Sequence, residues 1–451
     1  MTRTTLSGWG RAGSSAARLV AAPPEAPPDL ATQHRGTLAR GMARSYGDAA
    51  CNAGGVVIDM TSRGALRSFD TANGVVHVDA GATLDEVLRA TVPHGWFLAV
   101  TPGTAMITVG GAIAADVHGK NHPAAGSFRD HLRGFTLLTA DGDRRWVTPD
   151  DHDVFAATLG GMGLTGIVLD AEIALRRITT TQLRATVATT GDLDTTLEAL
   201  DASTAEYRVA TLDLMRTDRQ LGRGIVETAD HADHADTADE TDAHDAGGQS
   251  PLRFAPQQRF TVPSGVPGGL LNRMSALAFT RLWFARAPRR PEHRLVDMSG
   301  FFYPLDAVGH WNRLYGPRGF VQYQFAVPTG HEDTLRSVAE RFATARCPTF
   351  VAVLKRLGRG AGMLSFPIDG WTMTADIPAG VDGLSALLDD CDALVAAAGG
   401  RVYLAKDGRL QAGRLAQMYP EVDRWRQVRD RLDPDGRWRS DLGRRLGLCR
   451  S

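Results

Sequence analysis

Thr101-Pro-Gly-Thr-Ala-Met-Ile-Thr-Val-Gly-Gly-Ala-Ile-Ala-Ala-Asp-Val-His-Gly-Lys-Asn-His122 brings a turn, a glycine pair and several ionisable groups into one short stretch. Its Pro102-Gly103 pair is typical of a turn, and Thr108-Val-Gly-Gly111 leads into a short apolar segment that ends at Asp116. Small residues let backbone N–H groups approach a ligand closely, and the N–H groups at a helix start favour an anion such as a pyrophosphate. The glycine spacing is neither Gly-x-Gly-x-x-Gly nor Gly-x4-Gly-Lys-Ser/Thr, which argues against a nicotinamide-type Rossmann fold and against a P-loop. The stretch therefore predicts a cofactor-binding loop, and tight packing of the glycine pair is the alternative.

Two further glycine-rich turns strengthen the prediction of a ligand-binding region. Arg40-Gly-Met-Ala-Arg-Ser-Tyr-Gly-Asp48 follows a short strand-like segment, and Leu159-Gly-Gly-Met-Gly-Leu-Thr-Gly166 precedes an expected strand from Ile167 to Leu175. Two phosphate-binding loops separated by short strands resemble the flavin-binding domain of the vanillyl-alcohol oxidase and p-cresol methylhydroxylase superfamily. The resemblance implies that flavin adenine dinucleotide (FAD) lies between two small α+β lobes, with backbone amides of both loops on its phosphates.

Composition limits the classes of protein to consider. A chain of 451 residues is long for one core and predicts two or three domains. The net charge of -1 and the pI near 6.9 argue against a nucleic-acid-binding protein, which would carry a basic footprint. The cysteines, Cys51, Cys347, Cys391 and Cys449, show neither a zinc-binding spacing nor a disulfide framework.

The sequence gives no sign of a signal peptide, because Met1 to Leu19 lacks a continuous apolar core. Residues Trp96 to Ala115 are uncharged and long enough to cross a bilayer. They are interrupted by Pro102, Gly103 and the glycine pair, so we expect a buried cofactor loop there and, at most, a peripheral contact with a membrane.

Periodicity predicts an α+β fold. The expected strands and helices are listed by their residues: strands at Val56–Met60, Val75–Ala80, Phe135–Asp143, Arg145–Val147, Val321–Val327, Thr349–Lys355 and Gly399–Gly408, and helices at Leu84–Ala90, Leu384–Ala398 and Met418–Leu432. A domain boundary is expected near Thr181. The acidic tract 227–249 predicts a disordered surface loop, although its Asp and His residues also suggest metal binding.

Two segments of the second domain carry candidate ligand contacts. Period-two geometry puts Gln322 and Gln324 on one face of their strand, where they could bind a polyhydroxylated ligand or simply face solvent. Pro251 to Arg290 places apolar side chains beside arginines, which suits the edge of a lipid headgroup layer. A loop packed on its own domain is the equal alternative for this segment.

A series of motifs then makes the resemblance specific. In chain order they are Gly8-Trp-Gly-Arg11, Arg40 to Asp48, His118-Gly-Lys-Asn-His122 with Gly126-Ser-Phe128, Gly163-Leu-Thr-Gly166, Trp311-Asn-Arg-Leu-Tyr-Gly-Pro317, Gln322-Tyr-Gln-Phe325, Leu364-Ser-Phe-Pro367 and Tyr403-Leu-Ala-Lys-Asp407. Together they resemble the flavoprotein oxidase subunits of decaprenylphosphoryl-β-D-ribose 2′-epimerases, over nearly the whole chain. The resemblance implies a two-domain fold in which residues 1–180 and 401–451 hold FAD, and residues 181–400, with an antiparallel sheet, bind the substrate.

The same resemblance implies an activity. Enzymes of this family oxidise the 2′-hydroxyl of a polyprenylphosphoryl-β-D-ribose by hydride transfer to flavin. A separate short-chain-type keto-reductase then completes the epimerisation to the arabinose donor for cell-wall arabinan in actinobacteria. The family holds its FAD noncovalently and works at the inner membrane as a peripheral protein. Its side of the membrane is expected to be the cell-envelope or periplasmic one, with the cytoplasmic face as the alternative.

Site residues follow from the matching motifs. The implied FAD contacts are Arg40, Gly41, Met42, Ala43, Arg44, Ser45, Tyr46, Gly47, Asp48, Ala49, Gly103, Thr108, Val109, Gly110, Gly111, Ala115, Asp116, Val117, His118, Val168 and Tyr403. The implied substrate contacts are Lys120, Gln322, Gln324, Lys355 and Thr374, and the implied catalytic residues are Lys406, His118 and Tyr46.

Chemistry suggests what two of these residues do. A lysine beside the flavin, Lys406, would stabilise the anionic reduced ring, and His118 could orient or deprotonate the sugar hydroxyl. His118 and His122 lack a third ligand nearby, so no metal site is expected.

Some residues depart from the family pattern. Thr374 stands where well-known members carry a cysteine, which predicts activity without covalent capture by thiol-directed inhibitors. The segment between Pro24 and Arg40 is shorter than in the family, and the acidic insertion is specific to this chain. The competing functions are an FAD-dependent aldonolactone or sugar oxidase of the same fold and a flavin-bearing scaffold for a partner reductase.

Overall fold

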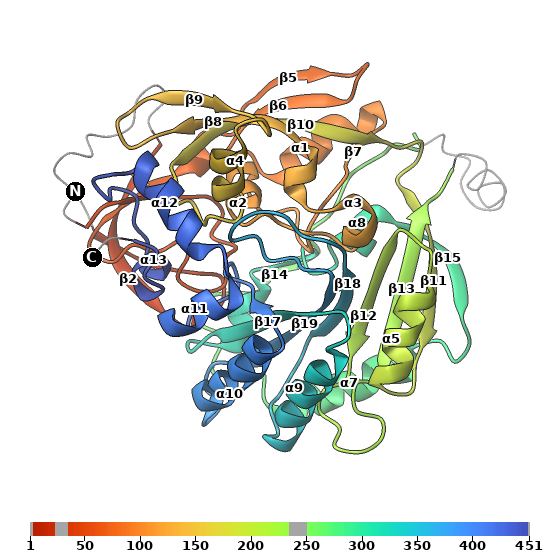
Figure 1. Cartoon of the computed structure of the whole chain (residues 1–451). Coiled ribbons are helices and arrows are strands. Elements are labelled where there is room, and N and C mark those ends of the chain that lie inside the picture. Colours follow the sequence, from red (N-terminus) through yellow and green to blue (C-terminus); the bar gives the residue numbers. More distant parts are fainter. Residues whose placement is uncertain (1–2, 23–34, 234–249, 450–451) are drawn as a thin grey trace.

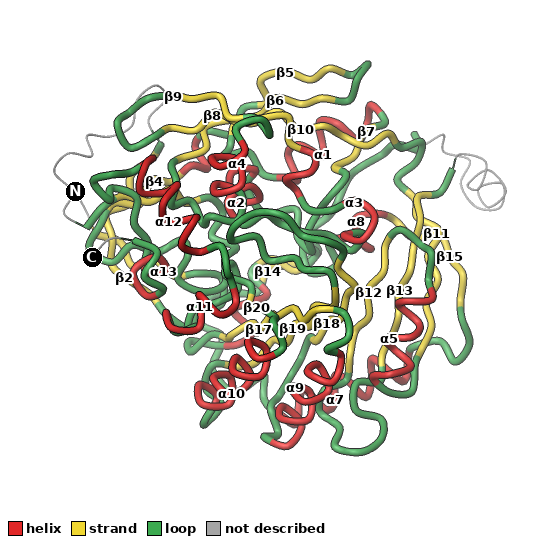
Figure 2. The backbone as a smooth tube through the Cα atoms, in the orientation of Figure 1, coloured by secondary structure: helices red, strands yellow, loops and turns green. Residues whose placement is uncertain are grey.

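A computed structural model describes residues 3–22, 35–233 and 250–449 (Figure 1). The α+β prediction is confirmed, because two small sheets with short helices stand beside one large antiparallel sheet (Figure 2). The segment between Pro24 and Arg40 that departs from the family pattern lies mostly outside the described residues.

The region expected to bind FAD, called the flavin-binding domain below, contains both small sheets. The first has the strand order β1-β2-β4-β3, and the second has the order β5-β6-β10-β8-β9 with β7 paired to β10. The strands are β1 (Arg3–Ser7), β2 (Ser14–Ala21), β3 (Thr37–Arg40), β4 (Val56–Asp59), β5 (Leu66–Asp70), β6 (Val75–Asp79), β7 (Trp96–Leu98), β8 (Leu132–Leu138), β9 (Arg144–Val147) and β10 (Ile167–Arg177). Helices α1 (Leu84–Thr91), α2 (Val109–Ala114), α3 (His122–Ala125) and α4 (His152–Thr158) connect them.

Local sequence explains where the helices of this domain begin. The Thr83 side chain accepts from the Glu86 N–H while Glu86 bonds back to Thr83, which is a capping box that starts α1. The Thr108 hydroxyl accepts from the Gly111 N–H and starts α2 at the predicted cofactor loop. The second phosphate-loop candidate therefore lies directly before the start of a helix, whereas the first, Arg40–Asp48, lies between β3 and β4.

The region expected to bind the substrate, called the substrate domain below, is built on an eight-stranded sheet of order β15-β11-β13-β12-β18-β19-β17-β20. Its strands are β11 (Gln182–Thr189), β12 (Tyr207–Leu212), β13 (Gly224–His231), β15 (Glu292–Asp297), β17 (Phe320–Pro328), β18 (Ala352–Leu357), β19 (Gly370–Pro378) and β20 (Arg401–Val402), and a separate pair is formed by β14 (Phe260–Thr261) and β16 (Val308–Gly309). Helices α5 (Leu193–Ala202), α9 (Glu332–Thr344) and α10 (Leu384–Ala397) pack on one face of the sheet (Figure 1), whereas α7 (Arg273–Arg286) and α8 (Met298–Phe302) belong to the long connection before β17.

The chain then returns to the flavin-binding domain through α11 (Ala412–Met418), α12 (Val422–Leu432) and α13 (Asp441–Arg445). The indole N–H of Trp425 on α12 donates to the carbonyl of Ala157 on α4 at 2.8 Å, and its ring is fully buried. Since β20 still pairs with β17, the return starts after Val402.

Three sequence-based predictions of local structure differ in part from the structure. The tract expected to be disordered from Glu227 begins as the second half of β13, because Glu227–His231 pair with β11 on one side and partly with β12 on the other. Residues 234–249 of that tract lie outside the described residues. The helix expected from Met418 to Leu432 is two helices separated at Pro420, which cannot continue a helix.

The third difference concerns a strand. In the segment Gly399–Gly408 the strand is limited to Arg401–Val402, and a turn follows because the N–H groups of Lys406 and Asp407 fold back onto the carbonyl of Tyr403. The segment Pro251–Arg290, for which a packed loop and a lipid-edge segment were the alternatives, contains the helix α7 and so is not a loop throughout.

No helix in the described ranges is both long and apolar enough to cross a membrane. The uncharged stretch Trp96–Ala115 instead forms β7, a connecting loop and α2. Its apolar side chains, such as Phe97 and Ile113, are buried in the core of the flavin-binding domain. The expected buried loop is therefore limited to the connection between β7 and α2, and a strand and a helix form the rest of the stretch.

Candidate active site

A cavity of about 1260 Å³ lies between the two domains. Loops of the flavin-binding domain line one part of it, and the inner face of β17, β18 and β19 lines another. Pockets for drug-sized ligands are roughly 300–1,000 Å³. The cavity is therefore large enough for a dinucleotide together with a second ligand.

The loop after β3 offers unpaired backbone donors to this cavity. None of the N–H groups of residues 42–45 donates a hydrogen bond to another part of the described chain. Ala43 has a positive φ of 53°, which turns successive amides towards the same side. Arg40 fixes the base of the loop by donating to the carbonyls of Ala50 and Ser7, both at 2.7 Å. Unsatisfied amides around a cavity fit the phosphate oxygens of a bound dinucleotide.

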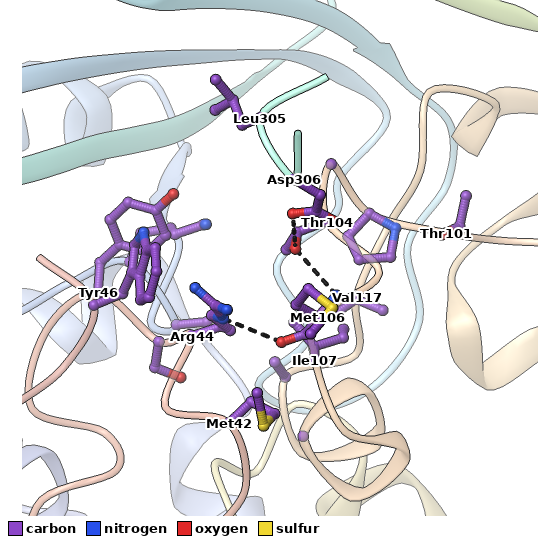
Figure 3. Close-up of a pocket in the computed structure, with 18 of the residues that line it drawn as sticks. Met42, Arg44, Tyr46, Thr101, Thr104, Met106, Ile107, Val117, Leu305 and Asp306 are labelled. Atoms are coloured by element: carbon purple, nitrogen blue, oxygen red, sulfur yellow. Dashed lines mark hydrogen bonds between the residues drawn. The ribbon is translucent and has the colours of Figure 1, made fainter. Parts of the chain in front are cut away.

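The second glycine-bearing loop lies directly against the first. A Cβ at Gly41 would be 2.1 Å from the Thr108 hydroxyl, so this close approach requires glycine. Arg44 donates from Nε to the Met106 carbonyl at 3.1 Å, and its guanidinium lies 3.7 Å from the centre of the Trp9 ring. Figure 3 shows Arg44 and Met106 on facing walls of the cavity, joined by this hydrogen bond. The two loops thus form one continuous binding surface.

A carboxylate from the substrate domain fixes the far end of the second loop. Asp306 accepts from the Thr104 hydroxyl at 2.6 Å and from the Ala105 N–H at 2.8 Å. The Thr104 contact is visible in Figure 3. Burial raises the pKa of Asp306, and these hydrogen bonds oppose the shift. No sequence motif marks Asp306, because it lies in the connection between α8 and β16.

Most of the residues expected to contact FAD line the cavity, namely Arg40, Gly41, Met42, Ala43, Arg44, Ser45, Tyr46, Ala49, Gly103, Thr108, Gly110, Gly111, Ala115, Val117, His118, Val168 and Tyr403. Gly47, Asp48, Val109 and Asp116 do not.

These four support the loops instead. Gly47 packs against the backbone of Asp407, where a Cβ would be 1.8 Å from the carbonyl oxygen, and Asp48 pairs with Arg445 at 2.8 Å. Val109 is fully buried, and Asp116 accepts hydrogen bonds from Ser127 and Ser365 in the core.

The predicted substrate residues meet on the other side of the cavity. Gln322 lies opposite Asp376 in the ladder between β17 and β19, and Gln324 lies opposite Thr374. All four line the cavity, so this face of the sheet is not simply solvated. Asp376 is a further residue of this face that was not among the expected contacts, although strand alternation places it on the same face as Thr374.

Lys120, Lys355 and Lys406 place three amines around this part of the cavity. Burial lowers the pKa of Lys406 to about 7, with Asp376 opposing the shift and Lys355 adding to it. Burial lowers the pKa of Lys120 and of Lys355 to about 8 each. The Lys406 ammonium lies 3.7 Å from the centre of the Tyr46 ring, which is a cation–π contact between two predicted catalytic residues.

Asp376 is the acidic partner of this cluster. Burial raises the pKa of Asp376 to about 7, against the lowering effects of Gln322 and Lys406. The Gln322 amide donates to the carboxylate at 2.5 Å. A buried carboxyl and a buried amine that both titrate near neutrality are typical of groups that transfer protons.

His118 is neutral in this setting. Burial, together with Lys355, His122 and Lys406, lowers the pKa of His118 well below its usual range. The Gln324 amide nitrogen lies 3.2 Å from His118 Nε2 and can only donate, so the proton of the neutral ring is on Nδ1. That Nδ1 has no partner among the described residues and is therefore free to donate to a ligand.

The described residues contain no cluster of three His, Cys, Asp or Glu side chains suited to a metal ion. His122, considered with His118 as a metal pair, accepts at Nδ1 from the Gly358 N–H at 3.0 Å. His122 therefore holds β18 against the flavin-binding domain.

Comparison with known proteins agrees with this geometry. Residues 29–148 match the family described as "FAD binding domain", and residues 379–446 match the family described as "D-arabinono-1,4-lactone oxidase". The decaprenylphosphoryl-β-D-ribose oxidase of Mycolicibacterium smegmatis is 39% identical over 459 aligned residues, which cover 99% of this chain and 98% of that protein. The chain belongs to the FAD-dependent oxidoreductases of the vanillyl-alcohol oxidase type.

Other relatives of this flavoenzyme differ in how much of the chain they match. An uncharacterised protein of Streptomyces coelicolor is 41% identical over 81% of this chain and all of its own length. Cytokinin dehydrogenase 7 of Oryza sativa is 31% identical over 38% of this chain and 37% of its own.

FAD fits the residues present in this flavoenzyme. The free amides of residues 42–45 and the adjoining loop around Thr108 would hold the diphosphate. The isoalloxazine would then lie towards Tyr46, His118 and Lys406, which line the cavity between the phosphate loops and the sheet. Bound FAD supplies an acceptor for a hydride.

Proposed function

We propose that this flavoenzyme oxidises the 2′-hydroxyl of a polyprenylphosphoryl-β-D-ribose to a ketone, with FAD as the hydride acceptor. This reaction is the first half of an epimerisation to the arabinose donor for cell-wall arabinan. The observation that carries the proposal is the cluster of Lys120, Lys355, Gln322 and Gln324 at the side of the cavity away from the phosphate loops. The full-length similarity to a decaprenylphosphoryl-β-D-ribose oxidase supports the same substrate class.

The chemistry of this cluster suits a sugar that carries an anionic phosphodiester. Lysine ammonium groups are common phosphate ligands, and the pKa values of Lys120 and Lys355, about 8, leave most of their charge at neutral pH. The amides of Gln322 and Gln324 both donate and accept, as sugar hydroxyls require. Lys120 already donates to the Phe301 carbonyl at 2.6 Å, so the charge that an uncharged lactone would leave without a partner among the described residues is that of Lys355.

Oxidation of the alcohol removes a hydride from C2′ and a proton from the hydroxyl. Asp376 is the group we assign to the proton, because a carboxyl with a pKa of about 7 is half ionised at neutral pH and is protonated by the reaction. His118 carries its proton on Nδ1 and orients the sugar by donating to an oxygen. Lys406, held over the Tyr46 ring, provides positive charge where negative charge develops.

The remaining parts of the proposal concern attachment and partners. We assign noncovalent binding to FAD, a short-chain-type keto-reductase as the partner that consumes the ketone, and a peripheral place at the inner membrane, on its periplasmic or cell-envelope side. The cytoplasmic side is the alternative location.

A second candidate, a sugar-lactone oxidase, is favoured by the match of residues 379–446 to the D-arabinono-1,4-lactone oxidase family. Anaerobic mixing of the FAD-loaded protein with one substrate at a time separates the candidates. Loss of flavin absorbance with polyprenylphosphoryl ribose, and none with free ribose, is the expected result. Loss with an aldonolactone alone would replace the proposal by lactone oxidation, and no loss with either would favour a scaffold for the partner reductase.

A matched pair of variants tests the role of the lysine cluster. Lys355→Met should raise the substrate concentration needed for half-maximal flavin reduction by at least tenfold. The substitution removes one positive charge from the lysine cluster that is proposed to bind the phosphodiester of the substrate. Arg359→Met removes a nearby exposed charge that does not line the cavity, and should leave that concentration unchanged.

A further inference from the structure

Helix α7 exposes an apolar surface that its own domain does not cover. Of its fourteen residues, only Ala276 and Thr280 are buried. The exposed fractions are 75% for Met274, 50% for Leu282 and 49% for Trp283. A helix on a globular protein normally turns its apolar residues towards the core. The outward apolar side chains of α7 therefore need another partner.

The exposed apolar residues of the molecule are concentrated in this region. Six of the ten large apolar side chains exposed in the described ranges lie between Phe260 and Trp283. Contiguous exposed apolar patches mark sites of contact with proteins or membranes. We call the surface formed by residues 260–290 the α7 surface; helix α7 is labelled in the lower part of Figure 1, and β14 nearer the middle.

This region carries a net positive charge. Residues 250–291 contain arginine at seven positions and neither Asp nor Glu, in a chain whose net charge is -1. Arg281, Arg286, Arg289 and Arg290 are exposed, and none of them forms an ion pair with a described residue. The partner must therefore be both apolar and negatively charged.

We propose that the α7 surface docks on a membrane leaflet that carries anionic headgroups. Apolar side chains such as Leu282 and Met274 would enter the boundary between headgroups and acyl chains, and the arginines would bind lipid phosphates. A second copy of the chain fits less well. Two α7 surfaces related by a two-fold axis would face arginines with arginines and offer no carboxylate to either side.

The position of the active-site cavity agrees with this orientation. Phe279 and Trp283 stack with their ring centres 5.7 Å apart, and both also line the cavity. The docking surface therefore borders the cavity. On the proposed function, a lipid-linked sugar could keep its polyprenyl chain in the membrane while its ribose reaches Gln322 and Lys355.

Flotation of the FAD-loaded protein with vesicles tests the proposal. The vesicles are phosphatidylcholine alone or phosphatidylcholine with phosphatidylglycerol, and neither contains a sugar lipid. The protein should float only with the anionic vesicles, and added salt should weaken binding. No binding to either kind of vesicle would overturn the proposal.

Matched variants locate the contact. The triple variant Arg281→Gln, Arg289→Gln, Arg290→Gln should bind about one hundred-fold more weakly, since each arginine near an anionic surface accounts for about a five-fold change. The control Arg3→Gln, Arg133→Gln, Arg144→Gln removes the same charge from exposed positions of the flavin-binding domain and should bind nearly as wild type.

A variant that changes exposed apolar side chains completes the test, with flavin absorbance and the thermal midpoint as measurements of folding. Met274→Ser with Leu282→Ser should also release the protein, while flavin absorbance and the thermal midpoint report that each variant is folded. Equal binding by wild type and both α7 variants would overturn the proposal, as would an oligomer in solution that the α7 variants dissociate. Oxidation of detergent-dispersed substrate, measured separately, reports on the proposed reaction and not on docking.

Discussion

Asp376→Asn is the substitution that most directly tests the proton chemistry of the site. It keeps the shape of the side chain but removes its negative charge and its ability to accept a proton. In the wild type, Asp376 and Lys406 both titrate near pH 7. Reduction should rise with pH as Asp376 ionises and fall as Lys406 loses its charge, which gives a bell-shaped profile centred near neutrality.

The expected loss of flavin reduction rate in Asp376→Asn follows from the groups that surround Asp376 and Lys406. Asp376 raises the pKa of Lys406, and loss of an opposite charge typically lowers a pKa by about 1–3 units. A drop of about one unit reduces the charged fraction of Lys406 at pH 7 from about half to about a tenth, a five-fold loss. Loss of the proton acceptor adds a factor of about 10²–10⁴.

Anaerobic stopped-flow measurement of flavin absorbance across pH, with the lipid-linked sugar, provides the assay. The Asp376→Asn variant should lose the acid limb, and its alkaline limb should move to lower pH. Asp306→Asn is the control, because Asp306 lines the same cavity but is not among the groups that set the pKa of Lys406. A bell-shaped profile with unchanged limbs in Asp376→Asn would refute the assignment.

Three other outcomes are expected. Gly41→Ala should weaken FAD retention by at least tenfold in ultrafiltration, because its Cβ would be 2.1 Å from the Thr108 hydroxyl; Gly13→Ala, with open space around the new Cβ, should retain FAD as wild type does. Wild-type protein should stay unmodified by thiol-directed electrophiles that act at the active site, whereas Thr374→Cys, which places a thiol in the cavity wall, should gain one adduct by intact mass. Heat-denatured protein should release all of its flavin into the filtrate, and flavin that stays with the precipitated chain would contradict noncovalent binding.

The sequence predicts which loops of the flavin-binding domain line the cavity, because the signals are local. Turn residues such as Pro102 and Gly103, the glycine pair at Gly110, and the capping residues of α1 act over a few positions. The loops they form line the cavity where the motifs placed them. Turns and helix caps of this kind depend on neighbouring residues and are therefore retained in the folded protein.

The substrate side depends on contacts that no local pattern encodes. Asp376 becomes part of the site only because β19 pairs with β17 in a register that places it opposite Gln322. Its raised pKa then comes from burial between two domains. Alternation alone could have placed Asp376 beside Thr374, but the identity of its neighbours required the pairing of the strands.

Helix α7 illustrates a second reason why local structure is not always predicted from the sequence. Prolines and glycines around residues 251–269 made the whole segment resemble a loop, yet Asn272 caps a regular helix immediately afterwards. Pro420 marks the break between α11 and α12 in the sequence. The helical pattern of the residues on both sides of it nevertheless predicted a single helix. Such errors arise when average composition is given more weight than a single residue with a strict conformational requirement.

The return of the chain after Val402 has a consequence for biosynthesis. Asp441 accepts from the Ala53 N–H at 2.8 Å, and Arg445 reaches back to Asp48, so residues far apart in the sequence complete one structural unit. On a ribosome, the early loops that line the cavity lack these partners until the segment 403–449 has been translated. Nascent chains that stall before that point would expose an unfinished half-domain to proteases and chaperones, even though the intervening sheet has already been made.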